Sequence, residues 1–177
     1  MWPFRTRVSI AKLRQVPSRR REPAEALGLG DLARDEIAWE ANKLLTAERP
    51  AEALVLFDLL AALWPRSSPD IVHLGRGVCR QTLGRLPEAD ESYTTAIELD
   101  PVAAAPHAWI NRGETRLLLG RFDSAADDLA RARQSLPDSP ASRDLLLRVH
   151  ELERILDIRR TRRAEITPAN VESNDRD

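Results

Sequence analysis

The strongest constraint on the fold is a stretch that recurs after 36 residues. Residues 73–101 read HLGRGVCRQTLGRLPEADESYTTAIELDP, and residues 109–137 read WINRGETRLLLGRFDSAADDLARARQSLP. Small residues and a closing proline recur at matching places, namely Gly77 and Gly113, Gly84 and Gly120, Ala89 and Ala125, Ala96 and Ala132, and Pro101 and Pro137. A repeat of this length with helical spacing predicts helix pairs that stack on one another.

The spacing inside the repeat predicts two packed helices. Ala89, Tyr93 and Ala96 are separated by four and three residues, which places them on one face of a helix. We expect Gly77, and Gly113 in the next copy, to let the backbones of the two helices approach closely. Gly84 suits the turn between the helices, because glycine adopts the left-handed conformation found at helix ends.

A weaker copy precedes these two by 36 residues. It keeps the register through small and apolar residues and a closing proline, at Ala41, Ala53, Phe57, Leu60 and Pro65. Glu48 stands where the later copies have their turn glycine.

The pattern resembles the tetratricopeptide repeat over about residues 31–140. Gly77 and Gly113 resemble the family's small residue in the first helix, and the run Asn111, Arg112, Gly113 resembles a common variant of that motif. The alanines at 89, 96, 125 and 132 resemble the signature alanines of the second helix. The resemblance implies an all-α, right-handed α-solenoid of three helix pairs with a C-terminal capping helix, although the period here is 36 residues and the family's is usually 34.

The sequence divides into three segments by composition. We expect a basic flexible arm at 1–21, a repeat domain at 22–163 and a disordered tail at 164–177. Within the domain, the repeats are predicted at about 31–66, 70–102 and 106–138, with Asp31 as an N-cap, and the capping helix at 141–163.

The arm combines basic residues with scattered apolar residues and has no acidic residue. Its basic residues are Arg5, Arg7, Lys12, Arg14, Arg19, Arg20 and Arg21. Such a segment suits an anionic membrane surface, an acidic protein, a targeting presequence or no specific role. The alternatives stay open.

Charge argues against nucleic acid as the partner of the repeats. Residues 22–141 carry 20 acidic and 12 basic side chains, whereas phosphate contact requires basic charge on the binding surface. No stretch is long and apolar enough to span a membrane, so we expect a cytoplasmic protein, with peripheral membrane attachment as the alternative.

Signals for chemistry are sparse. The three histidines show no metal-ligand spacing, and we expect Cys79 to be a packing residue. Asp123 is predicted to cap a helix, with Asp127 and Asp128 on a solvated face. We therefore expect no enzyme activity, no cofactor and no metal site.

The remaining candidate site is the inner surface formed by the first helix of each pair. We expect three stripes there, Ala38, Asn42 and Leu45, then Leu74, Val78 and Gln81, then Ile110, Glu114 and Leu117. Asn42 and Asn111 are similar to asparagines of the family's carboxylate clamp, but the clamp lysines are absent, so that function is not carried over. The leading hypothesis is a non-enzymatic adaptor that binds a protein or peptide in this groove. The alternatives are a membrane-peripheral, self-associating subunit, and a groove covered by the chain's own arm or capping helix.

Overall fold

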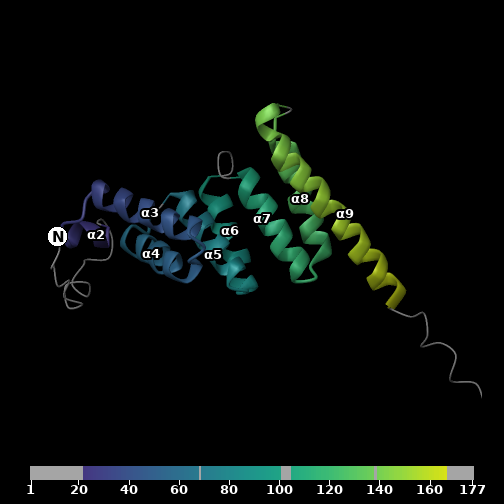
Figure 1. The fold of residues 1–177 in the computed structure, drawn as a ribbon. Helices are drawn as coiled ribbons and strands as arrows, with labels where there is room; N and C mark the ends of the chain where they lie inside the picture. The colour runs from purple at the N-terminus through teal and green to yellow at the C-terminus, as the bar shows by residue number, and fades with distance from the viewer. Residues whose placement is uncertain (1–21, 68, 101–104, 138, 167–177) are drawn as a thin grey trace, which may run out of the picture. The chain divides into compact units, whose positions relative to one another are not determined.

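The computed structural model describes residues 22–67, 69–100, 105–137 and 139–166, and helices account for nearly all of them (Figure 1). No strand occurs within these ranges. The helices are α2 (Pro23–Ala26), α3 (Asp31–Thr46), α4 (Pro50–Leu63), α5 (Asp70–Thr82), α6 (Leu86–Leu99), α7 (Ala105–Leu118), α8 (Phe122–Ser135) and α9 (Arg143–Ile166), with a 3-10 turn at Pro140–Ser142. The predicted all-α fold of helix pairs is confirmed.

The turns between paired helices share one geometry. Gly84 and Gly120 have φ angles of 74° and 73°, and Glu48 has a φ of 58° at the matching place. In each turn the next residue donates a backbone hydrogen bond five residues back, from Arg49 to Leu44 at 2.9 Å in the first repeat. The glycine prediction is therefore confirmed, and Glu48 adopts a left-handed conformation that an L-residue seldom occupies.

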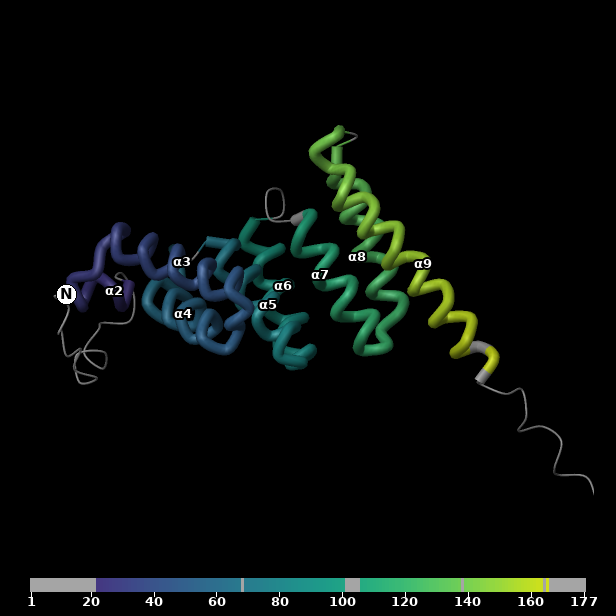
Figure 2. The backbone as a smooth tube through the Cα atoms, viewed as in Figure 1, coloured from purple at the N-terminus to yellow at the C-terminus, as the bar shows by residue number. Residues whose placement is uncertain are grey.

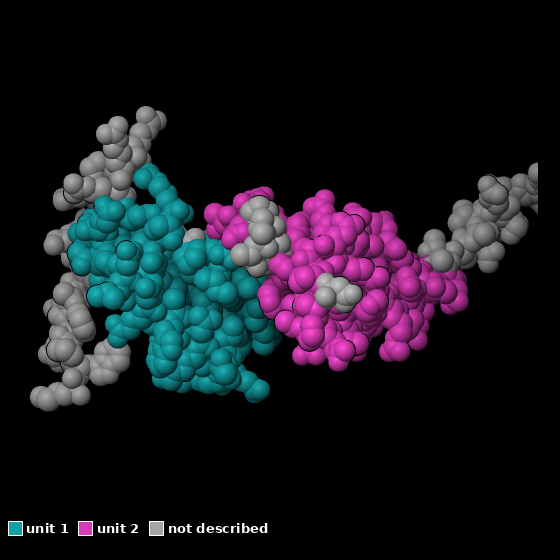
Figure 3. Space-filling model, turned by 90° about the horizontal axis from the view of Figure 1, so that it is seen from above, with its two compact units in different colours: residues 1–85 teal, residues 86–177 magenta. Residues whose placement is uncertain are grey.

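The chain forms two compact units, residues 1–85 and 86–177 (Figure 3). The first unit has an apolar core in which α4 packs against both α3 and α5. Phe57, Leu60 and Trp64 contribute large side chains that are at most 3% exposed, and Cys79 is fully buried with them. The boundary falls between α5 and α6, and the domain limits predicted from sequence stay predictions.

In the second unit α7 packs against α6 and α8, and α9 runs beside α8 (Figure 2). Gly113 explains the close approach of α7 to α8, since a Cβ atom there would lie 3.2 Å from the Leu129 side chain. Leu117, Ala125 and Leu156 form a small buried cluster that joins α7, α8 and α9. Val149, Leu152 and Leu156, which are spaced three and four residues apart in α9, are buried.

Three predictions about aspartates were wrong. Gly30 is the N-cap of α3, and Asp31 is the first helical residue, where its carboxylate binds Arg34 at 3.0 Å. Asp123 lies inside the first turn of α8, because the N-cap is Arg121. Asp128 is 1% exposed and not solvated, since two arginines surround its carboxylate.

None of the helices in the described ranges combines the length and the apolar character needed to cross a membrane.

Candidate functional site

The first two predicted stripes lie on α3 and α5, which contact each other within the first unit. Their apolar members are half-buried and Asn42 is exposed, and the six residues are Ala38, Asn42, Leu45, Leu74, Val78 and Gln81. Ile71, which is 47% exposed and one turn before Leu74, extends the α5 stripe. Apolar side chains here keep part of their surface open, as a peptide-binding surface requires.

Beside the α3 stripe lies an exposed tryptophan that sequence reasoning missed. Trp39 is 66% exposed, and the Lys43 ammonium lies 5.3 Å from its ring centroid. A shallow pocket is lined by Trp39, Asn42, Lys43, Thr46 and Ala47. The Asn42 amide donates to the Ala38 carbonyl oxygen at 2.8 Å, so one of its two N–H groups is hydrogen-bonded within α3.

The third predicted stripe, on α7, is in a different environment. Ile110 and Leu117 are 1% and 4% exposed, and Leu117 packs against Leu156 of α9. The Arg148 guanidinium of α9 binds the Glu114 carboxylate at 2.6 Å. The capping helix therefore contacts this stripe directly.

The seven basic residues predicted to form an electrostatic arm lie outside the described residues. Their proposed contacts with a membrane or an acidic protein stay a prediction.

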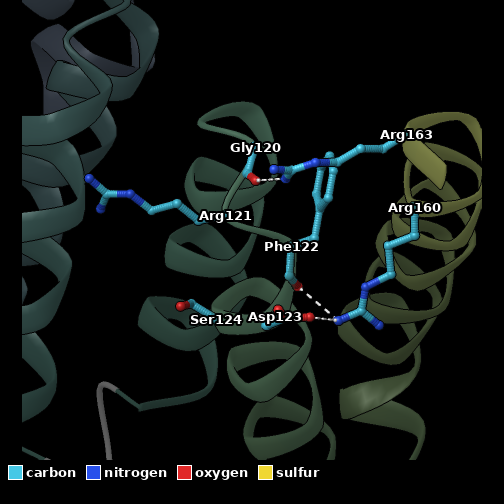
Figure 4. Close-up of a pocket in the computed structure, with 7 residues that line it drawn as sticks. All are labelled: Gly120, Arg121, Phe122, Asp123, Ser124, Arg160 and Arg163. Atoms are coloured by element: carbon cyan, nitrogen blue, oxygen red, sulfur yellow. Dashed lines mark hydrogen bonds and ion pairs between the residues drawn. The ribbon is translucent and has the colours of Figure 1, made fainter. Parts of the chain in front are cut away.

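A polar pocket lies where the start of α8 meets the end of α9 (Figure 4). The Arg160 guanidinium binds the Asp123 carboxylate at 2.6 Å, and the Arg163 guanidinium lies 5.6 Å from the Phe122 ring centroid. Arg163 also donates to the Gly120 carbonyl oxygen at 3.4 Å. These arginines bind α9 to the α7–α8 turn. The residues that line the pocket therefore hold the helices together.

The second unit contains a buried ion-pair network that was not predicted. The Arg112 guanidinium donates two hydrogen bonds to Asp128, at 2.9 and 2.8 Å, and a third to the Thr94 hydroxyl at 2.9 Å. Arg116 bridges Asp128 and Asp90, at 2.9 and 2.8 Å. The network connects α6, α7 and α8 through bidentate and bridging contacts, which fix geometry as well as charge.

A signal for this network was present in the sequence. Arg76 and Arg80 of α5 recur 36 residues later as Arg112 and Arg116. Arg76 binds Asp58 of α4 at 2.8 Å, so both arginine pairs join a helix to the one before it. Nothing in the spacing identified the acceptors, because Asp90 and Asp128 have no acidic counterparts 36 residues earlier.

Two titratable groups in the first unit have pKa values that are shifted by burial. Burial, and then the nearby Arg76 and Arg80, lower the pKa of His73. Burial, and then the Asp58 charge, raise the pKa of Cys79 to about 11. The Cys79 thiol is thus protonated and unreactive near neutral pH. Across the described ranges, histidine, cysteine and acidic side chains form no group of three that could hold a metal ion.

Comparison with solved structures shows what this fold resembles. The type III secretion chaperone SycD of Yersinia enterocolitica, in complex with a peptide of the translocator YopD, is similar, with a TM-score of 0.67 and 21% identity over 74% of this chain and 97% of that one. PcrH of Pseudomonas aeruginosa has a TM-score of 0.66 and 25% identity over 73% of this chain and 96% of that one. PcrH in complex with the chaperone binding region of PopB has a TM-score of 0.64 and 26% identity over 71% of this chain and 98% of that one.

Among curated proteins, the chain is 30% identical over 159 residues to the protein O-mannosyl-transferase TMTC1 of Mus musculus. The match covers 85% of this chain but only 16% of the length of that protein. No family model matches. The helix pairs, their shared turn geometry and these likenesses identify the chain as a tetratricopeptide-repeat protein, as the sequence predicts.

Proposed function

We propose that this chain is a non-enzymatic adaptor that binds a peptide segment of a partner protein along α3 and α5. The observation that carries the proposal is the likeness to SycD and PcrH, whose structures include complexes with a translocator peptide and with a chaperone binding region. The bound peptides are partners of SycD and PcrH. Only their mode of recognition, a peptide bound by helix pairs, is proposed for this chain.

The chemistry of the α3–α5 surface supports this mode. Leu45, Leu74 and Val78 offer apolar surface, while Asn42 and Gln81 provide side-chain amides that can orient a peptide backbone. Trp39 adds a large aromatic surface beside the stripe, and aromatic anchors contribute strongly to peptide binding.

The third stripe is not included in the proposed site. Leu117 is buried against α9, and Glu114 is paired with Arg148, so a peptide there would have to displace the capping helix. Within the described residues, nothing favours the alternative of a membrane-docking subunit.

A peptide selection followed by binding measurements tests the proposal. Peptides selected from a random display library against the full chain would be measured by fluorescence anisotropy against Trp39→Ala and Val78→Ser. We expect binding at least about tenfold weaker for each variant, equivalent to 1.4 kcal/mol. Leu99→Ser, which alters a 50% exposed leucine on α6, should bind like the original chain.

Circular dichroism would establish that the variants remain folded. Selected peptides that bind the α3 and α5 variants as tightly as the original chain would show that this surface is not the site.

A further inference from the structure

Helix α4 has two apolar faces, although packing within the first unit uses only one of them. The inner face is buried and consists of Ala53, Leu54, Phe57, Leu60 and Leu63. The outer face consists of Ala51, Val55, Leu59 and Ala62, all exposed, and Val55 and Leu59 are 65% and 40% exposed. A row of apolar residues at helical spacing that faces water indicates a surface that another element covers.

The other two repeats show that this outer face is not a requirement of the fold. Thirty-six residues after Val55 and Leu59, α6 carries Glu91 and Thr95. Thirty-six residues further, α8 carries Asp127 and Arg131, and both are exposed. The same register is therefore polar in α6 and α8 and apolar only in α4.

The order of residues on the outer face is nearly the same in both directions. Ala51, Val55, Leu59 and Ala62 read small, large, large, small, with steps of four, four and three residues. If two copies of α4 pack antiparallel about a two-fold axis, Val55 lies opposite Leu59 of the second copy, and Ala51 lies opposite Ala62. Such self-complementarity is what an isologous interface requires.

Charge extends this symmetry beyond the ends of the helix. Glu48 precedes the stripe, Arg66 follows it, and both are exposed. About the same two-fold axis Glu48 and Arg66 would exchange places, so opposite charges would face each other beyond both ends of the helix. We propose that the outer face of α4 is a homodimer interface formed by antiparallel pairing with α4 of a second copy.

The arm at 1–21 is the other candidate to cover this face, and charge argues against it. Its seven basic residues would need acidic partners, but the four positions of the outer face are apolar, and the acidic residues of the same helix, Glu52 and Asp58, already pair with Arg49 and Arg76. The dimer proposal is separate from the peptide site, because none of the four residues belongs to the α3–α5 surface.

Sedimentation velocity of the full chain over a range of concentrations tests the proposal. We expect a reversible dimer, and Val55→Glu with Leu59→Thr, residues that resemble those of α6, should raise the dissociation constant at least about tenfold. The matched control, Glu91→Gln with Thr95→Ala on α6, should leave it unchanged. A chain that stays monomeric at about 100 µM, a concentration at which even a weak dimer would form, overturns the proposal.

A second variant distinguishes a second copy of the chain from the arm as the element that covers the outer face of α4. In the full chain with all seven basic arm residues changed to Gln, the dimer should persist with its original dissociation constant. Loss of the dimer in this variant would assign the contact to the arm and overturn the proposal.

Cross-linking tests the antiparallel direction. With Ala51→Cys and Ala62→Cys together, a short bismaleimide should join two chains, whereas either change alone should not. The reason is that two copies of residue 51 would lie about 16 Å apart along the axis. Cys79 is fully buried and should not react. Cross-linking by each single variant would indicate parallel pairing, and no cross-link from the double variant would overturn the arrangement.

Discussion

The two units join consecutive helices with the same kinds of contact but with different emphasis, because the Asp58 side chain bound by Arg76 in the first unit is 45% exposed, whereas the Asp128 side chain in the second unit is 2% exposed. In the first unit the Phe57 ring of α4 lies against Gly75 of α5, so closely that a Cβ atom at position 75 would overlap the ring. In the second unit Arg112 and Arg116 of α7 bind Asp90 of α6 and Asp128 of α8.

The difference shows that one repeat register can rest mainly on close packing or mainly on buried charge. A contact made by shape tolerates no added volume, because protein interiors are close-packed. A contact made by buried charges tolerates no missing partner, because the remaining charge is left uncompensated in a low dielectric. The following predictions test this contrast.

The largest effect is expected from removing the shared acceptor of the network. Asp128→Asn leaves Arg112 and Arg116 without the carboxylate that both bind, at an expected cost of about 3–5 kcal/mol of unfolding free energy. Hydrogen exchange should show the loss of protection in α7 and α8. Asp127→Asn, on the exposed neighbour, should change stability by less than about 0.5 kcal/mol.

An added methyl group tests the shape contact. Gly75→Ala should lower the unfolding free energy by about 1–3 kcal/mol, because its Cβ overlaps the Phe57 ring. Phe57→Leu in the same chain should recover part of this loss. Gly113→Ala should cost less, since its nearest neighbours, Cδ2 and Cγ of Leu129, lie 3.2 Å away and do not overlap the added methyl group. Equal costs at the two glycines, measured by urea denaturation, would contradict the contrast.

The apolar character of the first unit predicts a dependence on alkaline pH. Because the pKa of Cys79 is about 11 in the folded chain and about 9 when unfolded, the unfolded state loses its proton first. Stability from this group is complete below pH 9 and decreases as the pH rises towards 11, by up to about 2 kcal/mol. Cys79→Ala should remove this decrease of stability with rising pH. Parallel curves for the two chains between pH 9 and 11 would show that the thiol does not contribute.

The smallest effect concerns the turns. Glu48 adopts the left-handed conformation that Gly120 adopts in the second unit. Glu48→Gly should therefore raise stability by about 0.5–1 kcal/mol, and Gly120→Ala should lower it by about 1 kcal/mol. Thermal melts at a concentration that keeps the chain monomeric would measure both, since Glu48 also belongs to the proposed dimer face.

The sequence was sufficient for features that depend on local chemistry. The turns at Gly84 and Gly120 and the close approach at Gly113 follow from what a glycine allows, so register alone located them. Contacts with partners far along the chain were not accessible in this way. The burial of Asp128 depends on Arg112 and Arg116 reaching it from another helix, and its neighbour Asp127, with the same chemistry, is exposed.

The candidate site shows the same division. The positions of the stripes on α3, α5 and α7 follow from helical periodicity, but their exposure does not. Leu117 is buried because α9 reaches it with Leu156, whereas Leu74 and Val78 on α5 remain half-exposed. Trp39 was not predicted as a site residue because it lies between the stripe positions and its exposure cannot be inferred from the spacing, although a lone exposed tryptophan is informative.

The contact between Phe57 and Gly75 also limits how such a chain can be rearranged. Where Gly75 stands in α5, α3 has Trp39 and α7 has Asn111, and both carry a side chain where Gly75 has only a hydrogen atom. The repeats are therefore not interchangeable modules. A gene that exchanged or duplicated one of them would encode a mismatched junction, so a longer array could arise from this chain only with compensating changes on both sides of the new joint.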